Sequence, residues 1–162
     1  SINIIDAGDN HTRDQAFRDG QGDYIHQQGP YPQQLEKDNI GHIVASVGKA
    51  IGPVAFSSLI ATPRWLSTDK ATAFTRAYVK ASIFVNTVSA AEIADAEVSF
   101  FPGIDLDVLT NTIEFYQKLG CWNPDPTIKN EHYERALDVF QYSGLISKRH
   151  PYKELVVTPP TA

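Results

Sequence analysis

The chain has 162 residues, of which 42% are hydrophobic and 20% are charged, as in an ordinary folded protein. Its formal net charge is −5 and no cluster of lysine and arginine offsets it, which argues against a nucleic-acid-binding protein. No apolar run approaches the roughly 20 residues of a membrane-spanning helix, and a single cysteine excludes an internal disulfide.

The first third of the chain has the pattern of short strands that alternate with short helices. Apolar runs bounded by turn residues predict strands at 2–6, 23–26 and 43–47. Between them, Thr12 and Gln15 have the spacing of a capping box for a helix that ends at Gly20, and Pro32 suits the first turn of a helix over 32–37. This order implies parallel pairing through right-handed crossovers, so we expect an α/β fold with a small, mainly parallel sheet.

The rest of the chain is predicted to be helical after one more extended run at 54–60. Pro63 separates that run from the helices that follow. Apolar periodicity and capping residues predict these helices at 69–86, 89–97, 105–120 and 129–142, with Ser89 and Asp105 as N-caps. The helix over 69–86 has one apolar stripe, which consists of Phe74, Ala77, Tyr78, Ala81, Phe84 and Val85.

Residue types that could carry catalysis or hold a metal are present, but their spacing does not indicate such a site. The five histidines are scattered, without the i,i+2 or i,i+4 pairs that bring two imidazoles to one ion. Ser57 and Ser58 lack the Gly-x-Ser-x-Gly elbow of a nucleophile, and Cys121, beside Trp122, is predicted to be a buried, unreactive thiol. We therefore expect no catalytic residue, no metal and no cofactor.

Two polar loops follow the first two predicted strands. In an open parallel sheet, ligands bind beyond the carboxyl ends of the strands. The residues predicted to bind a ligand in these loops are Asp6, Gly8, Gln28, Gly29 and Pro30. The loops contain no arginine, which disfavours a bidentate clamp for an anion. Turn chemistry alone also predicts such residues, so ordinary polar loops are the alternative.

Several passages, in this order, resemble one family of proteins. Residues 16–24, AFRDGQGDY, are similar to the passage from a helix through glycines into an Asp-Tyr strand in solute-binding proteins of the nitrate/sulfonate/taurine type, which are related to thiamine-pyrimidine-precursor proteins. Residues 116–122, YQKLGCW, and 133–140, YERALDVF, followed by 144–146 and Tyr152, are similar to the C-terminal helical region of that family.

The resemblance implies part of a type II periplasmic-binding-protein fold, in which two α/β lobes hold a solute between them. Members of the family are about twice as long as this chain, so we expect a fragment that lacks the N-terminal lobe. The implied regions are a partial second lobe at 1–53, a hinge crossing strand at 54–62, and a helical region at 63–162 that packs on the missing lobe. Apolar faces left exposed by that absence predict a homo-oligomer.

The resemblance also implies the function. It predicts a non-catalytic, periplasmic solute-binding component of an ABC importer, with the transporter permease as partner and a sulfonate, nitrate or pyrimidine-like solute. One alternative is a pyrimidine-precursor synthase-like enzyme. The fungal type of this enzyme carries a cysteine-rich motif, and the single cysteine here disfavours it. A regulatory ligand-sensing domain is a further alternative.

Overall fold

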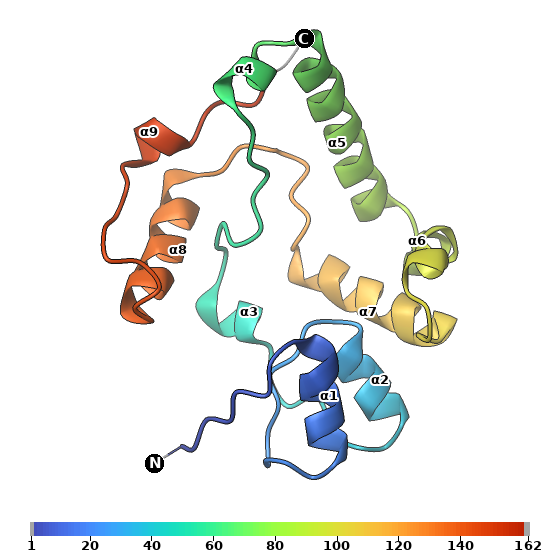
Figure 1. Cartoon of the computed structure of the whole chain (residues 1–162). Helices are drawn as coiled ribbons and strands as arrows, with labels where there is room; N and C mark the ends of the chain where they lie inside the picture. The colour runs from blue at the N-terminus through green and yellow to red at the C-terminus, as the bar shows by residue number, and fades with distance from the viewer. Residues whose placement is uncertain (1, 161–162) are drawn as a thin grey trace. The chain divides into compact units, whose positions relative to one another are not determined.

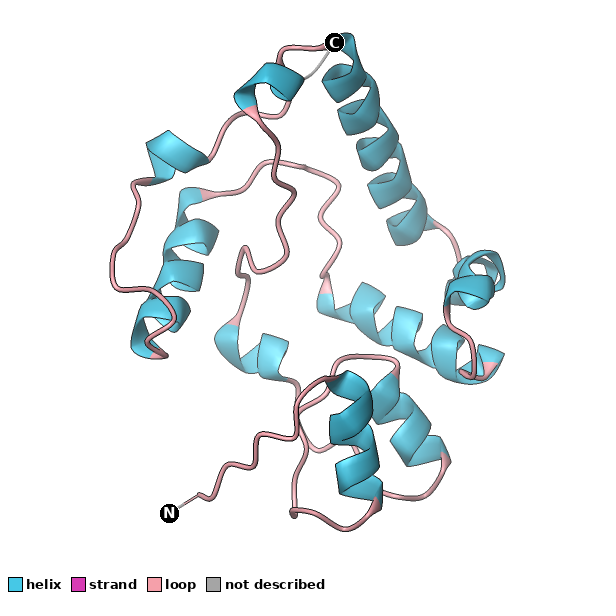
Figure 2. Cartoon of the chain, in the orientation of Figure 1, coloured by secondary structure: helices cyan, strands magenta, loops and turns pink. Residues whose placement is uncertain are grey.

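The computed structural model describes residues 2–160, which form helices joined by long loops (Figures 1 and 2). The chain divides into two compact units that interleave in sequence. Unit 1 comprises Ser1–Ser46 and Ser89–Lys118, and unit 2 comprises Val47–Val88 and Leu119–Ala162. The assignment of 1–53, 54–62 and 63–162 to a lobe, a hinge and a helical region stays a prediction.

The predicted α/β fold with a parallel sheet is wrong. Over residues 2–160 the structure contains no β-strand, and the runs at 2–6, 23–26, 43–47 and 54–60 are loops, except that Val47 begins a helix (Figure 2). Side chains in these runs are widely exposed, as shown by Ile2 at 92%, Ile4 at 87% and Ile60 at 95%. A strand forms only where a neighbouring strand completes its backbone hydrogen bonds, and an apolar pattern does not supply that neighbour.

Unit 1 is built from α1 (Asn10–Arg18), α2 (Tyr31–Lys37), α6 (Ala90–Glu97), η1 (Val98–Phe100) and most of α7 (Leu106–Leu119). Its buried apolar side chains come from α2, α6 and α7 and are Leu35, Ala90, Ile93, Ala94, Val108, Leu109 and Ile113. The core of this unit is therefore made by helices, and the two loops of the predicted ligand site belong to the same unit.

The ends of the unit 1 helices follow local capping chemistry. Ser89 caps α6 as predicted, since its side chain accepts a hydrogen bond from the Glu92 N–H at 3.3 Å. The cap of α1 is Asp9 and not Thr12, because the Asp9 carboxylate accepts from the Thr12 N–H at 2.9 Å. The predicted capping box at Thr12 is thus wrong, and α1 begins earlier in the chain than the pattern indicated.

Unit 2 contains α3 (Val47–Ile51), α4 (Pro63–Leu66), α5 (Asp69–Thr87), α8 (Asn130–Tyr142) and α9 (Tyr152–Leu155). Around α8, the Arg135 Nη1 donates to the Pro53 carbonyl oxygen at 2.7 Å, and the rings of Phe56 and Phe140 lie 5.4 Å apart. The C-terminal segment returns to α8 through the Tyr133 hydroxyl, which donates to the His150 carbonyl oxygen at 2.7 Å. Segments distant in sequence therefore contact α8 through both hydrogen bonds and aromatic rings.

The predicted helices over 69–86, 89–97, 105–120 and 129–142 are confirmed as α5, α6, α7 and α8. The apolar stripe of α5 is largely exposed. Phe74 is 46% exposed and Phe84 is 42% exposed, whereas the buried residues of α5 are Ala71, Thr75 and Ser82. Helical periodicity determines which residues share a face, but not which face the rest of the protein covers.

Candidate functional site

The two loops predicted to bind a ligand are joined by an arginine that the sequence pattern did not indicate. Arg13, in the first turns of α1, donates from Nη2 to the Gly8 carbonyl oxygen at 3.0 Å and from Nη1 to the His26 carbonyl oxygen at 3.1 Å. One guanidinium thus contacts both loops. The loops themselves contain no arginine, but the adjoining helix supplies one to both of them.

A glutamine makes a second connection between the loops. The Gln27 Nε2 donates to the Asn10 carbonyl oxygen at 2.6 Å, which fastens the second loop to the start of α1. The Gln27 Oε1 is buried and has no hydrogen-bond partner. A buried acceptor without a donor is costly, so an N–H or O–H group supplied to this oxygen would stabilise the site.

The first loop is held in a turn by its own residues. The Asp6 Oδ1 accepts from the Gly8 N–H at 3.1 Å, and Gly8 has a φ of 91°, a conformation that favours glycine. Asp6 and Gly8 are both exposed. The predicted ligand residues of this loop therefore lie at the surface beside Arg13, with the Asp6 carboxylate occupied in part by the turn.

The second loop packs against α7. The Gly29 N–H donates to the Tyr116 hydroxyl at 3.0 Å, and a Cβ atom added at Gly29 would lie 2.6 Å from the Thr112 Cγ2. Pro30 is buried, whereas Gln28 is exposed. Gly29 thus packs the loop against α7 and Pro30 is buried beside it, whereas the side chain of Gln28 is exposed to solvent. Their predicted role in ligand binding stays a prediction.

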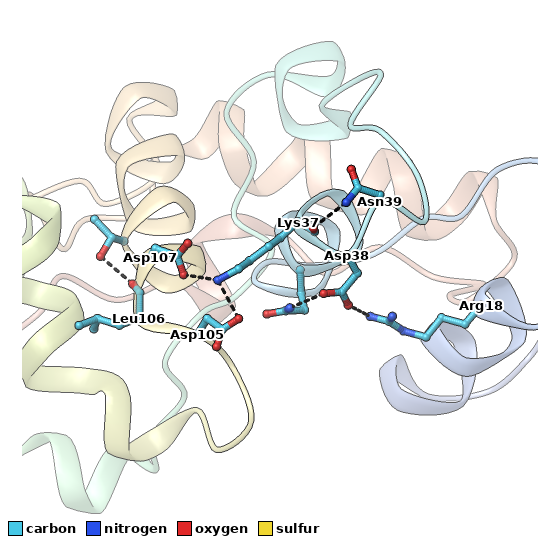
Figure 3. A network of polar contacts seen from close by, with 9 residues as sticks. Arg18, Lys37, Asp38, Asn39, Asp105, Leu106 and Asp107 are labelled. Carbon is cyan, nitrogen blue, oxygen red and sulfur yellow. Dashed lines mark hydrogen bonds and ion pairs between the residues drawn. The ribbon is translucent and has the colours of Figure 1, made fainter.

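A network of charges links the helices that carry these loops (Figure 3). The Lys37 ammonium, at the end of α2, lies 2.8 Å from the Asp105 carboxylate and 2.7 Å from that of Asp107 at the start of α7. The hydrogen bond from Lys37 holds the pKa of Asp107 below its ordinary value. In turn, the hydrogen bonds that Lys37 donates, first to Asp105 and second in effect to Asp107, raise the pKa of Lys37. The Arg18 guanidinium pairs with Asp38 at 2.8 Å, which joins α1 to the end of α2.

Ion pairs this exposed to solvent contribute little to stability, so their role is mainly to fix geometry. They hold three helices together: α1, which carries Arg13; α2, which follows the second loop; and α7, against which the second loop packs. All of these elements belong to unit 1. The site therefore has a scaffold that does not depend on how the two units are placed.

Two other features bear on the chemistry of the chain. Over residues 2–160, no group of three or more His, Cys, Asp or Glu side chains is close enough to hold a metal ion. Cys121 is exposed, so the prediction of a buried thiol is wrong. Desolvation by its neighbours raises the pKa of the Cys121 thiol, which keeps it protonated at neutral pH. Within the same residues, no helix has the length and apolar character needed to cross a membrane.

Comparison with known proteins gives one informative match. The chain is 36% identical over 143 residues to a protein of Bacillus subtilis (strain 168) named "Putative binding protein YtlA". The chain is similar to part of this protein. The match covers 87% of the chain but 43% of the B. subtilis relative, so the chain spans less than half of that protein. No family model matches the chain, and no solved structure matches it.

The B. subtilis relative is consistent with the solute-binding role expected from the sequence. Its name refers to binding and specifies neither a solute, nor a transporter, nor a compartment. The site geometry is compatible with such a role, because polar loops with exposed side chains are held together on a helical scaffold.

Proposed function

We propose that this chain is part of a periplasmic solute-binding protein of an ABC importer, which delivers a small solute to the transporter permease and does not act on it chemically. The observation that carries this proposal is the 36% identity to a protein named as a binding protein. The resemblance to solute-binding proteins of the nitrate/sulfonate/taurine type supports it independently. The remaining region of the longer protein would close over the solute.

Arg13 and Gln28 are the groups we assign to the solute on this chain. A guanidinium carries five N–H donors, and the Gly8 and His26 carbonyls use one from each terminal nitrogen. The other donors are left for an acceptor on the solute. The exposed carboxamide of Gln28 adds both a donor and an acceptor at the second loop.

This donor set favours an oxyanion over a neutral solute. Hydrogen bonds from a charged donor to sulfonate or nitrate oxygens are stronger than those between neutral groups. Asp6 and Asp9 lie nearby, and they disfavour a solute of high negative charge. A singly charged sulfonate or nitrate therefore fits better than a doubly charged anion, and a pyrimidine-like solute would instead use Gln28 and the unpaired Gln27 Oε1.

The test is calorimetric titration of the chain with methanesulfonate, taurine, nitrate and cytosine. We expect one of these probes to bind, and the Arg13→Lys variant to bind it at least about tenfold more weakly, because a hydrogen bond to a charged group stabilises by about 1.5–3 kcal/mol. Arg13→Lys keeps the charge but loses the forked donor that contacts both loops.

The matched control is Arg76→Lys on α5, which makes the same replacement on an exposed residue of unit 2. Circular dichroism should show equal helicity in both variants. Equal affinity of the two variants would contradict the role of Arg13. Failure of every probe to bind, both to this chain and to the full-length B. subtilis relative, would contradict the proposed function.

A further inference from the structure

One face of α5 carries small and aromatic side chains and is largely exposed to solvent. Ala73, Ala77 and Ala81 recur every four residues and are all exposed. Phe74 and Phe84 lie on either side of this alanine ridge and are nearly half exposed. Spacing by four places these side chains on one face of the helix, opposite the buried Ala71, Thr75 and Ser82.

The chain as a whole exposes more surface than a folded monomer of its size. Its accessible area is 11,777 Å² for a mass of 17.9 kDa. A compact monomer of that mass exposes about 8,000 Å², and two separate compact bodies of half the mass expose about 9,700 Å² in total. The surplus is thus about 2,000 Å² even if the units are treated as separate. A stable interface removes about 800 Å² from each partner.

The sequence of α5 is self-complementary when two copies run antiparallel and cross at Ala77. Ala73 of one copy then faces Ala81 of the other, so the small side chains allow the helices to approach closely. Lys70 of one copy then lies opposite Phe84 of the other, which places an exposed ammonium against an exposed aromatic ring. A parallel arrangement would instead bring Lys70 of one copy close to Lys70 of the other, so that like charges would face each other.

A hollow at the start of α5 fits this arrangement. It has a volume of about 530 Å³ and is lined by residues of α4, of α5 and of the turn between them, including Trp65 and Lys70. In the antiparallel crossing, the Phe84 ring of the second copy arrives beside Lys70. An aromatic ring next to Trp65 and the lysine stem would lose much of its exposure to water.

We propose that the α5 face defined by Ala73, Phe74, Ala77, Ala81 and Phe84 is a dimer interface, occupied by α5 of a second copy of this chain about a two-fold axis at Ala77. The inference does not depend on the proposed solute-binding function. It assigns the homo-oligomer expected from the sequence to a defined helix and orientation.

The test uses analytical ultracentrifugation of the chain and of variants at Ala77. We expect the unsubstituted chain to sediment as a dimer of twice 17.9 kDa. Ala77→Glu should weaken the dimer at least about tenfold, because the two-fold axis sets the new carboxylates against each other in a desolvated contact. Glutamate is a good helix former, so α5 itself should persist.

Ile83→Glu is the matched control. Ile83 is an exposed apolar residue of the same helix, and it points about 120° away from Ala77. This variant gains the same charge and should remain dimeric. Ala77→Lys alone should also be monomeric, but an equimolar mixture of A77E and A77K should recover the dimer, since only a two-fold contact at residue 77 brings the new glutamate against the new lysine.

Three results would overturn the proposal. The first is a monomeric unsubstituted chain at all concentrations, which would leave the α5 face to the additional region of the longer relative. The second is equal dissociation of A77E and I83E. The third is a mixture of A77E and A77K that stays monomeric although circular dichroism shows both variants to be folded.

Discussion

Replacement of Gly29 by alanine should destabilise unit 1 by overpacking and not by backbone strain. The added Cβ would lie 2.6 Å from the Thr112 Cγ2, 3.0 Å from the Tyr116 Oη and 3.2 Å from the Tyr116 Cε2. Thr112 is buried and its hydroxyl donates to the Val108 carbonyl oxygen at 2.8 Å, so its side chain cannot rotate away freely. The second loop would have to move off α7, with strain on its hydrogen bond to Tyr116.

The magnitude follows from the competing effects. Overpacking of this kind costs about 1–3 kcal/mol, and loss of the Gly29–Tyr116 hydrogen bond costs about 1 kcal/mol more. Against these, alanine stabilises by about 0.4–1 kcal/mol because it restricts the unfolded chain. The net expectation for Gly29→Ala is a loss of about 1–3.5 kcal/mol, measured by urea denaturation followed by circular dichroism.

The control for this reasoning is the Thr112→Ser variant. It deletes the methyl group that the added Cβ would strike and keeps the hydroxyl that bonds to Val108. In the G29A/T112S double variant we expect most of the loss caused by G29A to be recovered, with a coupling energy of about 1 kcal/mol or more. Strict additivity of the two substitutions, or a G29A variant as stable as the unsubstituted chain, would refute the reasoning.

Three further predictions concern stability elsewhere in the chain. Ser89→Ala removes the N-cap of α6 and should lower the free energy of unfolding by about 1 kcal/mol in urea titrations, whereas Ser89→Asp should not. The hydrogen bond from the Thr12 backbone N–H lowers the pKa of Asp9 from its ordinary 3.8. The ionised carboxylate therefore stabilises the folded chain above pH 3.8, and this stabilisation is lost as the pH falls through the lowered pKa. In acid, the urea midpoint of the Asp9→Asn variant should therefore depend less on pH than that of the unsubstituted chain. Arg135→Ala removes the hydrogen bond to the Pro53 carbonyl oxygen, and the nearby Ala55 N–H, which donates to the His132 carbonyl oxygen, should then exchange its hydrogen faster. Unchanged hydrogen exchange at Ala55 would show that Arg135 does not hold the segment around Pro53 against α8.

Much of the helical structure was predictable because its signals are local. Ser89 and its partner Glu92 lie within one helical turn, and the periodicity of 69–86 is complete within that segment. The predicted sheet failed because strands are stabilised by neighbours from elsewhere in the chain. The same apolar runs, such as 2–6 and 54–60, satisfy a strand pattern whether or not a partner is present.

The candidate site was predictable in part. The loops around Gly8 and Gln28 could be selected from turn residues, but the arginine that joins them could not. Arg13 lies one turn into the helix that opens from the first loop, and its contact with His26 crosses thirteen residues. Arg13 closely follows the first loop in the sequence, and its contact with Gly8 could have been predicted from that position. Nothing in the spacing indicates the second contact, because the direction of a side chain depends on how the two loops are folded.

The sequence by itself determined where the helices form, which residues share a face on each, and where glycine and polar residues make turns, since these depend on interactions between near neighbours. Tertiary structure decided which of those faces are covered, whether the apolar runs pair as strands, and which backbone groups Arg13 and Tyr116 contact. The reason is that burial and long-range hydrogen bonding depend on which other parts of the protein, or which partner, pack against a surface. Within a single chain, the apolar stripe of α5 stays largely exposed.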